Sequence, residues 1–263
     1  MFGFLNINKP SGITSSKVVY ILRKVLNIKQ IGHCGTLDPL ATGVLPVAVG
    51  KATRLIDYLP NNKKYIATFE LGKKSDSYDI DGNVVKVLNF DFSKINEKII
   101  TLVLNRFNGE FLQEVPAFSA VKVNGQKLYN LARKGFEIEN LPKKTIYIDN
   151  IKLLSYDNKQ KKGEFIVSCK KGVYVRSIIN DMGNYLGCGA IMTSLKRIIS
   201  NGFKFDNAIS DFQNLEILEN NLINPIDVLP YETLSVNESQ LKKIKFGQSI
   251  ENFNLKWNNK ILM

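Results

Sequence analysis

The spacing of apolar and polar residues predicts a strand and a helix at the start of the chain. Phe4 to Asn8 forms a short strand-like run that ends at the turn Lys9-Pro10-Ser11-Gly12. From about Ser15 to Asn27, apolar side chains recur at helical spacing, which predicts a helix with one buried face. Thr14 or Ser15 is expected to cap this helix, because a hydroxyl accepts hydrogen bonds from the free N–H groups of the first turn.

Strand and helix patterns alternate through the middle of the chain. Val44 to Val49 is a compact apolar run typical of a buried strand, and Lys51 to Leu59 is expected to form a short helix. Tyr65 to Leu71 alternates apolar with polar residues, which predicts a strand with one apolar face. Ser93 to Phe107 is predicted to be a helix capped by Ser93.

The second half of the chain continues with strand patterns. Thr145 to Tyr156 alternates like a strand, and Glu164 to Cys169 is predicted to pair with Val173 to Arg176 as a β-hairpin. Alternation within the second hairpin strand would place Tyr174 and Arg176 on the face opposite its two valines. A helix is expected to follow at once. We find no internal repeat and no linker in the first ~230 residues, an ordinary size for one domain of mixed helices and strands.

One short stretch differs from these periodic elements. Gly32 to Gly43 reads GHCGTLDPLATG, and its three glycines, proline and single carboxylate predict a shaped loop. Pro39 restricts Asp38 to extended conformations, so the carboxylate is held in one place. No lysine or arginine lies between Gly32 and Gly50, so a cation that pairs with Asp38 must come from elsewhere. An aspartate before a proline also matches a helix cap, and this structural alternative stays open at the level of the pattern.

Composition narrows the class of protein. Hydrophobic residues make up 44% of the 263 residues, and no apolar run reaches the ~20 residues of a membrane span. The first residues lack the basic-then-apolar order of a secretory signal, so we expect a cytoplasmic protein. Three cysteines without a CxxC pair and one histidine predict reduced thiols and no metal cofactor. Asp76, Asp79 and Asp81 faintly match a calcium loop, but the pattern fails downstream because no glutamate follows at its twelfth position.

Charge points modestly to a nucleic acid. The formal net charge of +12 favours a polyanionic partner. The chain is generally rich in lysine, asparagine and isoleucine, however, and such a bias raises the charge without selection for binding. Phe111 to Gly135 predicts a loop that runs into a helix, with Lys127, Arg133 and Lys134 interleaved with aromatic residues. This pattern fits an RNA-contacting surface, and an ordinary amphipathic helix explains it equally well.

The loop sequence resembles a known motif. Gly-His-x-Gly-Thr-Leu-Asp-Pro-x-Ala-x-Gly, from Gly32 to Gly43, is similar to the active-site motif of the TruB family of tRNA pseudouridine-55 synthases. The segments NKPSGITS, Lys-x-Tyr, KGVYVRSII and SLKRIISNGF also match, and the resemblance extends to about residue 230. It implies an α+β pseudouridine synthase fold, with a largely antiparallel central sheet flanked by helices. Residues 1–232 would form the catalytic domain, with an RNA-binding thumb at about 110–140. Residues 233–263 would form a short extension, a truncated PUA-like remnant.

The resemblance also implies an activity and a set of site residues. The chain would isomerise uridine 55 in the T arm of tRNA, after flipping the base out and without a cofactor. The implied roles are those of nucleophile for Asp38, base stacking or general base for Tyr65, pairing with Asp38 for Arg176, pocket lining for Tyr174 and Leu195, and contact with the displaced nucleotide for His33. From the pattern alone, Tyr65 also fits a core residue, whereas the pattern favours a surface charge for Arg176 and a structural side chain for His33.

Several alternatives remain open from the sequence. The nucleophile could add to C6 of uracil or to C1′ of the ribose, or could help to eliminate a glycal. A protein that binds or refolds tRNA without chemistry would need the same basic surface, and a related synthase could act on another RNA. We expect a monomer with no obligate protein partner and no membrane association.

Overall fold

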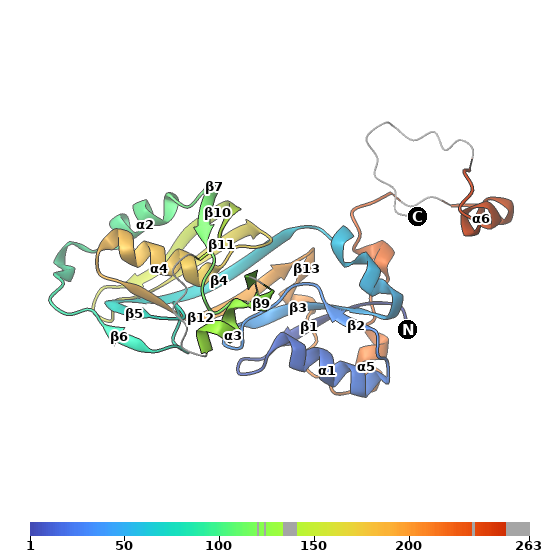
Figure 1. Cartoon of the computed structure of the whole chain (residues 1–263), viewed down its shortest axis with the longest axis horizontal. Helices are drawn as coiled ribbons and strands as arrows, with labels where there is room; N and C mark the ends of the chain where they lie inside the picture. The colour runs from blue at the N-terminus through green and yellow to red at the C-terminus, as the bar shows by residue number, and fades with distance from the viewer. Residues whose placement is uncertain (120, 124, 134–140, 233–234, 251–263) are drawn as a thin grey trace.

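The computed structural model describes residues 1–119, 121–123, 125–133, 141–232 and 235–250. Nine strands of this part of the chain form one sheet: β1 (Gly3–Lys9), β2 (Ile31–His33), β3 (Thr42–Val49), β4 (Asn62–Leu71), β7 (Gly109–Glu114), β10 (Lys143–Asp157), β11 (Lys162–Lys170), β12 (Ala190–Ser200) and β13 (Phe203–Lys204). The order is β1-β3-β12-β4-β11-β10-β7, with β2 beside β3 and β13 beside β12 (Figure 1).

Helices flank this sheet, so the predicted α+β class is confirmed. The α-helices are α1 (Ser15–Leu26), α2 (Glu97–Asn105), α3 (Leu128–Arg133), α4 (Val175–Leu186), α5 (Leu215–Asn220) and α6 (Glu238–Lys245). Short 3-10 helices are η1 (Gly50–Tyr58), η2 (Phe92–Lys94), η3 (Phe205–Asn207) and η4 (Pro225–Asp227). Two small hairpins pair β5 (Lys73–Ser75) with β6 (Val84–Lys86), and β8 (Lys122–Val123) with β9 (Gln126–Lys127). No helix of the described residues is long and apolar enough to cross a membrane.

The helix α1 forms as its sequence predicts. The Thr14 side chain accepts a hydrogen bond from the backbone N–H of Lys17, and Asn27 ends the helix in the left-handed conformation at φ 51°. Val18 and Leu22 are fully buried in the main hydrophobic core. This places the N-terminus of α1, and the turn before it, against the sheet.

Two halves of the sheet meet through one short parallel pairing. The other pairs among the nine strands of the sheet are antiparallel, which confirms the largely antiparallel topology. In the parallel pair, β12 meets β3 at Lys196↔Thr42 and Arg197↔Gly43. Gly43 has φ +97°, and a Cβ there would collide with the Arg197 carbonyl oxygen. Only glycine lets the two backbones approach this closely.

The prediction that Val173 to Arg176 forms the second strand of a β-hairpin is wrong. Helix α4 begins at Val175, and Tyr174 caps it in an extended conformation. The apolar residues from Val175 to Met182 already follow helical spacing, and this longer pattern prevails over a four-residue alternation. Arg176 therefore projects from the first turn of a helix.

Three smaller boundaries also differ from the prediction. The helix expected over Ser93 to Phe107 is shorter, because the Asn96 side chain caps α2 by accepting from the Ile99 N–H. The loop around Asp38 is shorter than predicted at both ends, because Gly32 lies in β2 and Gly43 in β3. The short helix after β3 is confirmed as a 3-10 helix.

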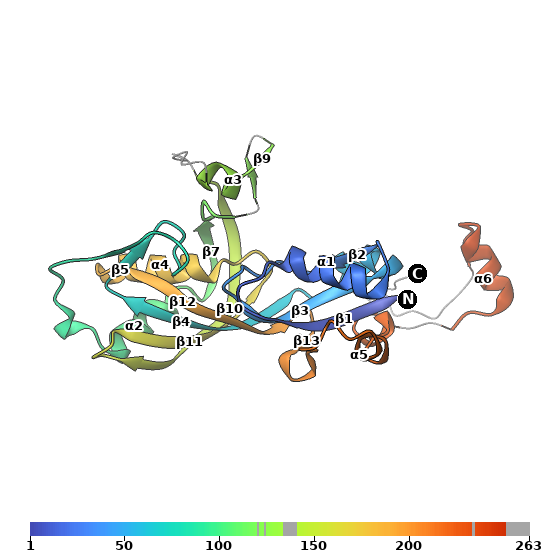
Figure 2. The ribbon, with the colours of Figure 1, turned by 90° about the horizontal axis from the view of Figure 1, so that it is seen from below.

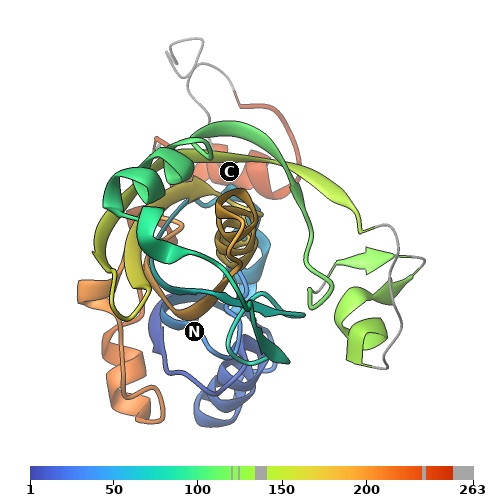
Figure 3. The ribbon, with the colours of Figure 1, turned by 90° about the vertical axis from the view of Figure 1, so that its left-hand side faces the viewer.

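The views from other sides show how the pieces are arranged. In Figure 2, α1 and α4 lie on the same side of the sheet, and α3 and β9 stand away from it on that side. In the end view of Figure 3, the sheet curves around α4. The predicted thumb includes α3 and β9, whereas Lys134 lies outside the described residues. The C-terminal extension contains α6, which lies apart from the sheet (Figure 1).

Candidate active site

The loop that carries Asp38 joins β2 to β3 and is fixed to the start of α1. The Ser15 hydroxyl is buried, donates to the Leu37 carbonyl at 3.0 Å and accepts from the Leu37 N–H at 2.8 Å. On the other side of Asp38, the Gly12 N–H donates to the Pro39 carbonyl at 2.9 Å. Both neighbours of Asp38 are therefore held by the turn and the last residue of the NKPSGITS segment.

Asp38 does not cap a helix. The Ala41 N–H donates to the Asp38 carbonyl at 3.0 Å and closes a turn, and no helix begins at Pro39. The Asp38 side chain is 34% exposed. The structural alternative from the sequence is therefore excluded, and the carboxylate remains accessible to a substrate.

The buried side chain of Lys9 stabilises the Asp38 loop. Its side chain is fully buried, and its ammonium donates to the carbonyls of Pro10 at 2.8 Å, Ile13 at 2.7 Å and Pro39 at 3.2 Å. Burial lowers the Lys9 pKa to about 8, although the Asp38 carboxylate opposes this shift. Hydrogen bonds to three carbonyl oxygens thus offset the free-energy cost of removing the Lys9 ammonium from water.

Arg197 clamps both ends of the same loop. Its side chain is fully buried, and the Nε group donates to the Val44 carbonyl at 2.7 Å. The Nη1 and Nη2 groups donate to the carbonyls of Thr36 at 3.2 Å and Gly35 at 3.0 Å. The sequence analysis missed this residue, although it lies in the SLKRIISNGF segment, because nothing local distinguishes a clamping arginine from a surface one.

Arg176 brings two carboxylates together. Its Nη2 lies 3.7 Å from Asp38 Oδ2, and its Nη1 lies 3.3 Å from Asp79 Oδ2. Nη2 also donates to the Phe118 carbonyl at 2.7 Å, and the side chain is only 5% exposed. The sequence left open whether Arg176 is a surface charge, and the structure buries it beside Asp38.

Asp79 is the second site residue that the sequence analysis missed as such. It is 3% exposed, and its Oδ1 accepts from the Ser77 hydroxyl at 2.6 Å and from the Asp81 N–H at 3.1 Å. The local pattern showed only a polar turn with three aspartates. Its pairing with Arg176 depends on residues far apart in the chain, so no local signal could reveal it.

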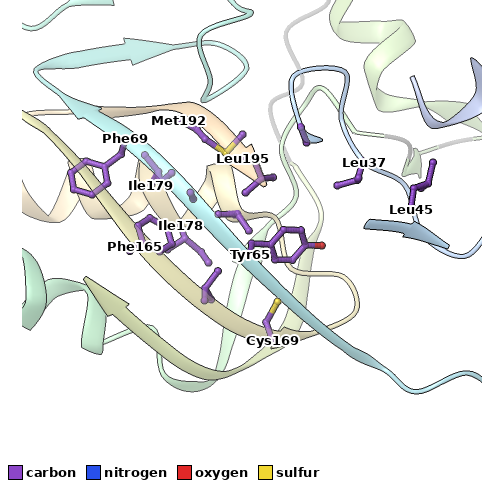
Figure 4. Close-up of a cluster of buried hydrophobic side chains, with 14 of the residues drawn as sticks. Leu37, Leu45, Tyr65, Phe69, Phe165, Cys169, Ile178, Ile179, Met192 and Leu195 are labelled. Atoms are coloured by element: carbon purple, nitrogen blue, oxygen red, sulfur yellow. The ribbon is translucent and has the colours of Figure 1, made fainter. Parts of the chain in front are cut away.

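Tyr65 and Leu195 lie on the adjacent strands β4 and β12, where Tyr65 is opposite Arg197 and Leu195 is opposite Ala67, and both are buried. In Figure 4 the Tyr65 ring projects from β4 with its hydroxyl toward Leu37 of the Asp38 loop. The Arg197 guanidinium lies 6.0 Å from the ring centroid. Burial raises the pKa of Tyr65, so its hydroxyl stays protonated at neutral pH. This favours base stacking over a general-base role.

Tyr174 and His33 complete the set of sequence-predicted residues. The side-chain amide of Gln113 accepts a hydrogen bond from the backbone N–H of Tyr174 and donates one to the Tyr174 carbonyl. The Arg176 guanidinium lies 5.9 Å from the Tyr174 ring centroid. His33 lies at the base of the loop in β2, and burial, with the Arg197 charge, lowers its pKa. Its Nδ1 is buried without a hydrogen-bond partner among the described residues. Asp38, Arg176 and Tyr174 are thus brought together, whereas no interaction joins His33 to Asp38.

The described residues offer no obvious metal site. Within this part of the chain, no three histidine, cysteine or carboxylate side chains gather closely enough to hold an ion. The site offers the chemistry of one accessible carboxylate, a buried guanidinium and aromatic side chains.

Similarity to known proteins defines the class. Residues 23–175 match the family described as TruB family pseudouridylate synthase (N terminal domain), a span that includes the Asp38 loop, Tyr65 and Tyr174. The fold and site are therefore those of a pseudouridylate synthase. The chain is 44% identical to a tRNA pseudouridine synthase B of Clostridium acetobutylicum, over 95% of this chain and 86% of that protein. It is 42% identical to that of Prochlorococcus marinus, over 89% and 73%. The chain belongs to the TruB family.

Solved structures agree with this fold. A chain in the crystal structure of a Cbf5-Nop10-Gar1 complex matches with a TM-score of 0.62 and 32% identity, over 82% of this chain and 54% of that one. A chain of an H/ACA RNP bound to a substrate RNA containing 2'-deoxyuridine matches with a TM-score of 0.59 and 30% identity, over 82% and 53%. The present chain spans about half the length of both.

Proposed function

We propose that this chain converts uridine 55 in the T arm of tRNA to pseudouridine without a cofactor. The relatives named tRNA pseudouridine synthase B match it over most of its length. The observation that carries the proposal is the pairing of the accessible Asp38 carboxylate with the buried Arg176 guanidinium at 3.7 Å. Such a pair orients a nucleophile and leaves its free oxygen for the substrate.

The reaction exchanges one bond to the ribose for another. The N1–C1′ bond breaks, a C5–C1′ bond forms, N1 gains a proton and C5 loses one. Asp38 acts as the nucleophile at C6 or at C1′, or assists elimination to a glycal, and each route divides the barrier into smaller steps. The uridine must first leave its stack, at a cost of a few kcal/mol.

The remaining site residues receive the flipped nucleotide. Tyr65 stacks on the uracil, while Tyr174 and Leu195 line the pocket that holds it. His33 lies partly exposed at the base of the Asp38 loop and contacts the nucleotide displaced from the RNA loop. Aromatic and apolar walls of this kind are how enzymes hold extruded bases.

The proposal extends to the organisation of the chain. Residues 1–232 act as the catalytic domain, and the thumb at about 110–140 clamps the RNA stem-loop. Residues 233–263 form an extension that contributes little to catalysis. The protein acts as a monomer in the cytoplasm, with tRNA as its partner and no obligate protein subunit.

Asp38→Asn tests the chemistry, because it keeps the shape of the side chain and removes its charge. We expect pseudouridine formation in T-arm RNA to fall by roughly three orders of magnitude or more, while RNA affinity changes by no more than about threefold. Pseudouridine is measured by mass spectrometry of digested RNA, and affinity by filter binding. Asp157→Asn, a charge change at the exposed last residue of β10, is the control.

Two outcomes would contradict the proposal. A variant with asparagine at position 38 that modifies RNA at the wild-type rate would remove Asp38 from the chemistry. A wild-type chain that binds T-arm RNA tightly and forms no pseudouridine would favour a non-catalytic tRNA-binding protein. Mapping pseudouridine in RNA from cells that lack the protein would reveal a target other than uridine 55.

A further inference from the structure

Lys63 lies beside the Asp38 loop. It is on the same face of β4 as Tyr65, because residues two apart in a strand share a face. A methyl group at Gly35 would lie 2.9 Å from the Lys63 Nζ and 3.8 Å from the Arg197 Nη1. Both cations therefore approach the same backbone position, three residues before Asp38.

The charge of Lys63 is not balanced within the described part of the chain. No carboxylate there lies within 4.0 Å of its Nζ, and the nearby charged groups that act on it include two cations, Arg197 and Lys171. Elsewhere, Lys73 pairs with Glu70 at 2.7 Å, and Lys170 pairs with an aspartate. Burial, with the Arg197 charge beside it, lowers the Lys63 pKa to about 8. A desolvated cation next to another cation is unfavourable unless an anion joins them.

Arg197 is not the residue that would bind an incoming anion. Its guanidinium is fully buried, and it donates to three backbone carbonyls, those of Gly35 and Thr36 in the loop and that of Val44 in β3. Lys63 keeps partial exposure, and the exposed Lys171 stands near it in the turn after β11. Lys63 is therefore the cation of this pair that an incoming anion can reach.

We propose that Lys63 binds a backbone phosphate of the RNA strand next to the flipped uridine. The proposal rests on the proposed function, because a nucleophile aimed at C6 or C1′ requires the ribose, and hence its phosphates, to lie close to Asp38. A lysine ammonium is a compact charge with three donors and suits a phosphate rather than a base edge. Lys63 thus positions the nucleotide, and the buried Arg197 adds to the positive electrostatic potential at this position.

Lys63→Gln tests the contact, and Lys64→Gln is its matched control, because each removes one charge and Lys64 points to the opposite face of β4. Affinity for a T-arm stem-loop is measured from about 50 to 200 mM salt, in chains that also carry Asp38→Asn so that no turnover occurs. We expect Lys63→Gln to weaken binding roughly tenfold and to reduce the slope of log K against log salt by about 0.7 to 1. The control is expected to leave the slope unchanged.

A set of RNAs that each carry one uncharged methylphosphonate linkage identifies the phosphate. One linkage near the target uridine should weaken binding to the chain that retains Lys63 and have no effect on the Lys63→Gln chain. The proposal is overturned if Lys63→Gln keeps the original salt slope, or if every linkage weakens both chains equally. Thermal melting verifies that both variants fold. Because binding is read without turnover, this result is independent of whether the native chain forms pseudouridine.

Discussion

Arg176 and Arg197 are both buried, and their surroundings give them different tasks. Arg197 donates to the carbonyls of Gly35 and Thr36 in the Asp38 loop and of Val44 in β3, so it shapes the loop. Arg176 meets Asp38 at 3.7 Å and Asp79 at 3.3 Å. The shorter of these two ion pairs is the one with Asp79, which anchors the guanidinium and leaves Asp38 more loosely held.

Asp79→Asn is expected to slow catalysis with little effect on RNA binding. The amide keeps the shape but removes the charge that anchors Arg176, and hydrogen bonds to charged groups contribute about 1.5–3 kcal/mol. A loss of this size in the transition state corresponds to a rate roughly 10- to 100-fold lower. Single-turnover rates of pseudouridine formation and binding constants provide the measurement.

Asp76→Asn is the control for that change. Asp76 lies in the same segment and is exposed, and it hydrogen-bonds to Asn83 rather than to Arg176. Equal losses of rate in both variants would show that the segment as a whole, and not the Asp79–Arg176 ion pair, controls the rate.

At the scale of elements, the short parallel pairing of β3 with β12 joins the Asp38 loop to the strand that carries Leu195 and Arg197. The periodic patterns predicted α1 and β4 correctly, because each forms through local spacing and a single buried face. They failed at the start of α4. There the position of Tyr174 depends on Gln113, from a strand distant in the sequence.

Gly43→Ala is expected to destabilise the fold by about 2–5 kcal/mol. Left-handed φ costs a non-glycine residue about 1–2 kcal/mol, and the clash with the Arg197 carbonyl oxygen adds an overpacking cost of about 1–3 kcal/mol. Gly109→Ala separates the two effects, because Gly109 has φ +90° and open space around it. Unfolding in urea measures both variants. Equal losses would mean that close backbone approach at Gly43 contributes nothing.

Asp181 on α4 gives a pH-dependent prediction. Burial raises its pKa from 3.8 to about 6, and it lines a cavity of about 270 Å³ between α2, β7 and α4. Between these pH values the folded state binds more protons than the unfolded state, so stability falls as pH rises from about 4 to 6. Asp181→Asn should therefore stabilise the protein by about 1–2 kcal/mol at pH 8, allowing for partial solvent exposure.

The same experiment contains its own check. Near pH 4 the native carboxyl is protonated and resembles the amide, so the two chains should have similar free energies of unfolding. A constant gap between them from pH 4 to pH 8 would show that titration of Asp181 is not the cause.

At the scale of the whole molecule, the folded core ends before the C-terminal extension. Among the described residues, neither hydrophobic cluster includes a residue beyond Leu229, and α6 buries none of its side chains. The described part of the extension, residues 235–250, therefore adds little to the stability of the sheet and its helices.

A chain that ends at residue 232 should fold and act on an isolated T-arm stem-loop. We expect its melting temperature to change by about 2 °C or less, since the described residues beyond 232 belong to neither hydrophobic cluster, and its rate to stay within about twofold. Calorimetry and pseudouridine assays on the stem-loop measure both. Aggregation, or a much lower melting temperature, would place the domain boundary elsewhere.

The sequence by itself determined the elements with strong periodicity, the shaped loop around Asp38 and, through its motifs, the family. These features depend on local spacing or on the chemistry of neighbouring residues. Only the tertiary structure decided that Arg176 lies between Asp38 and Asp79, that Arg197 clamps the loop and that Lys63 stands beside it. Burial and charge pairing depend on which distant segments meet, and no local pattern of apolar and polar residues records that.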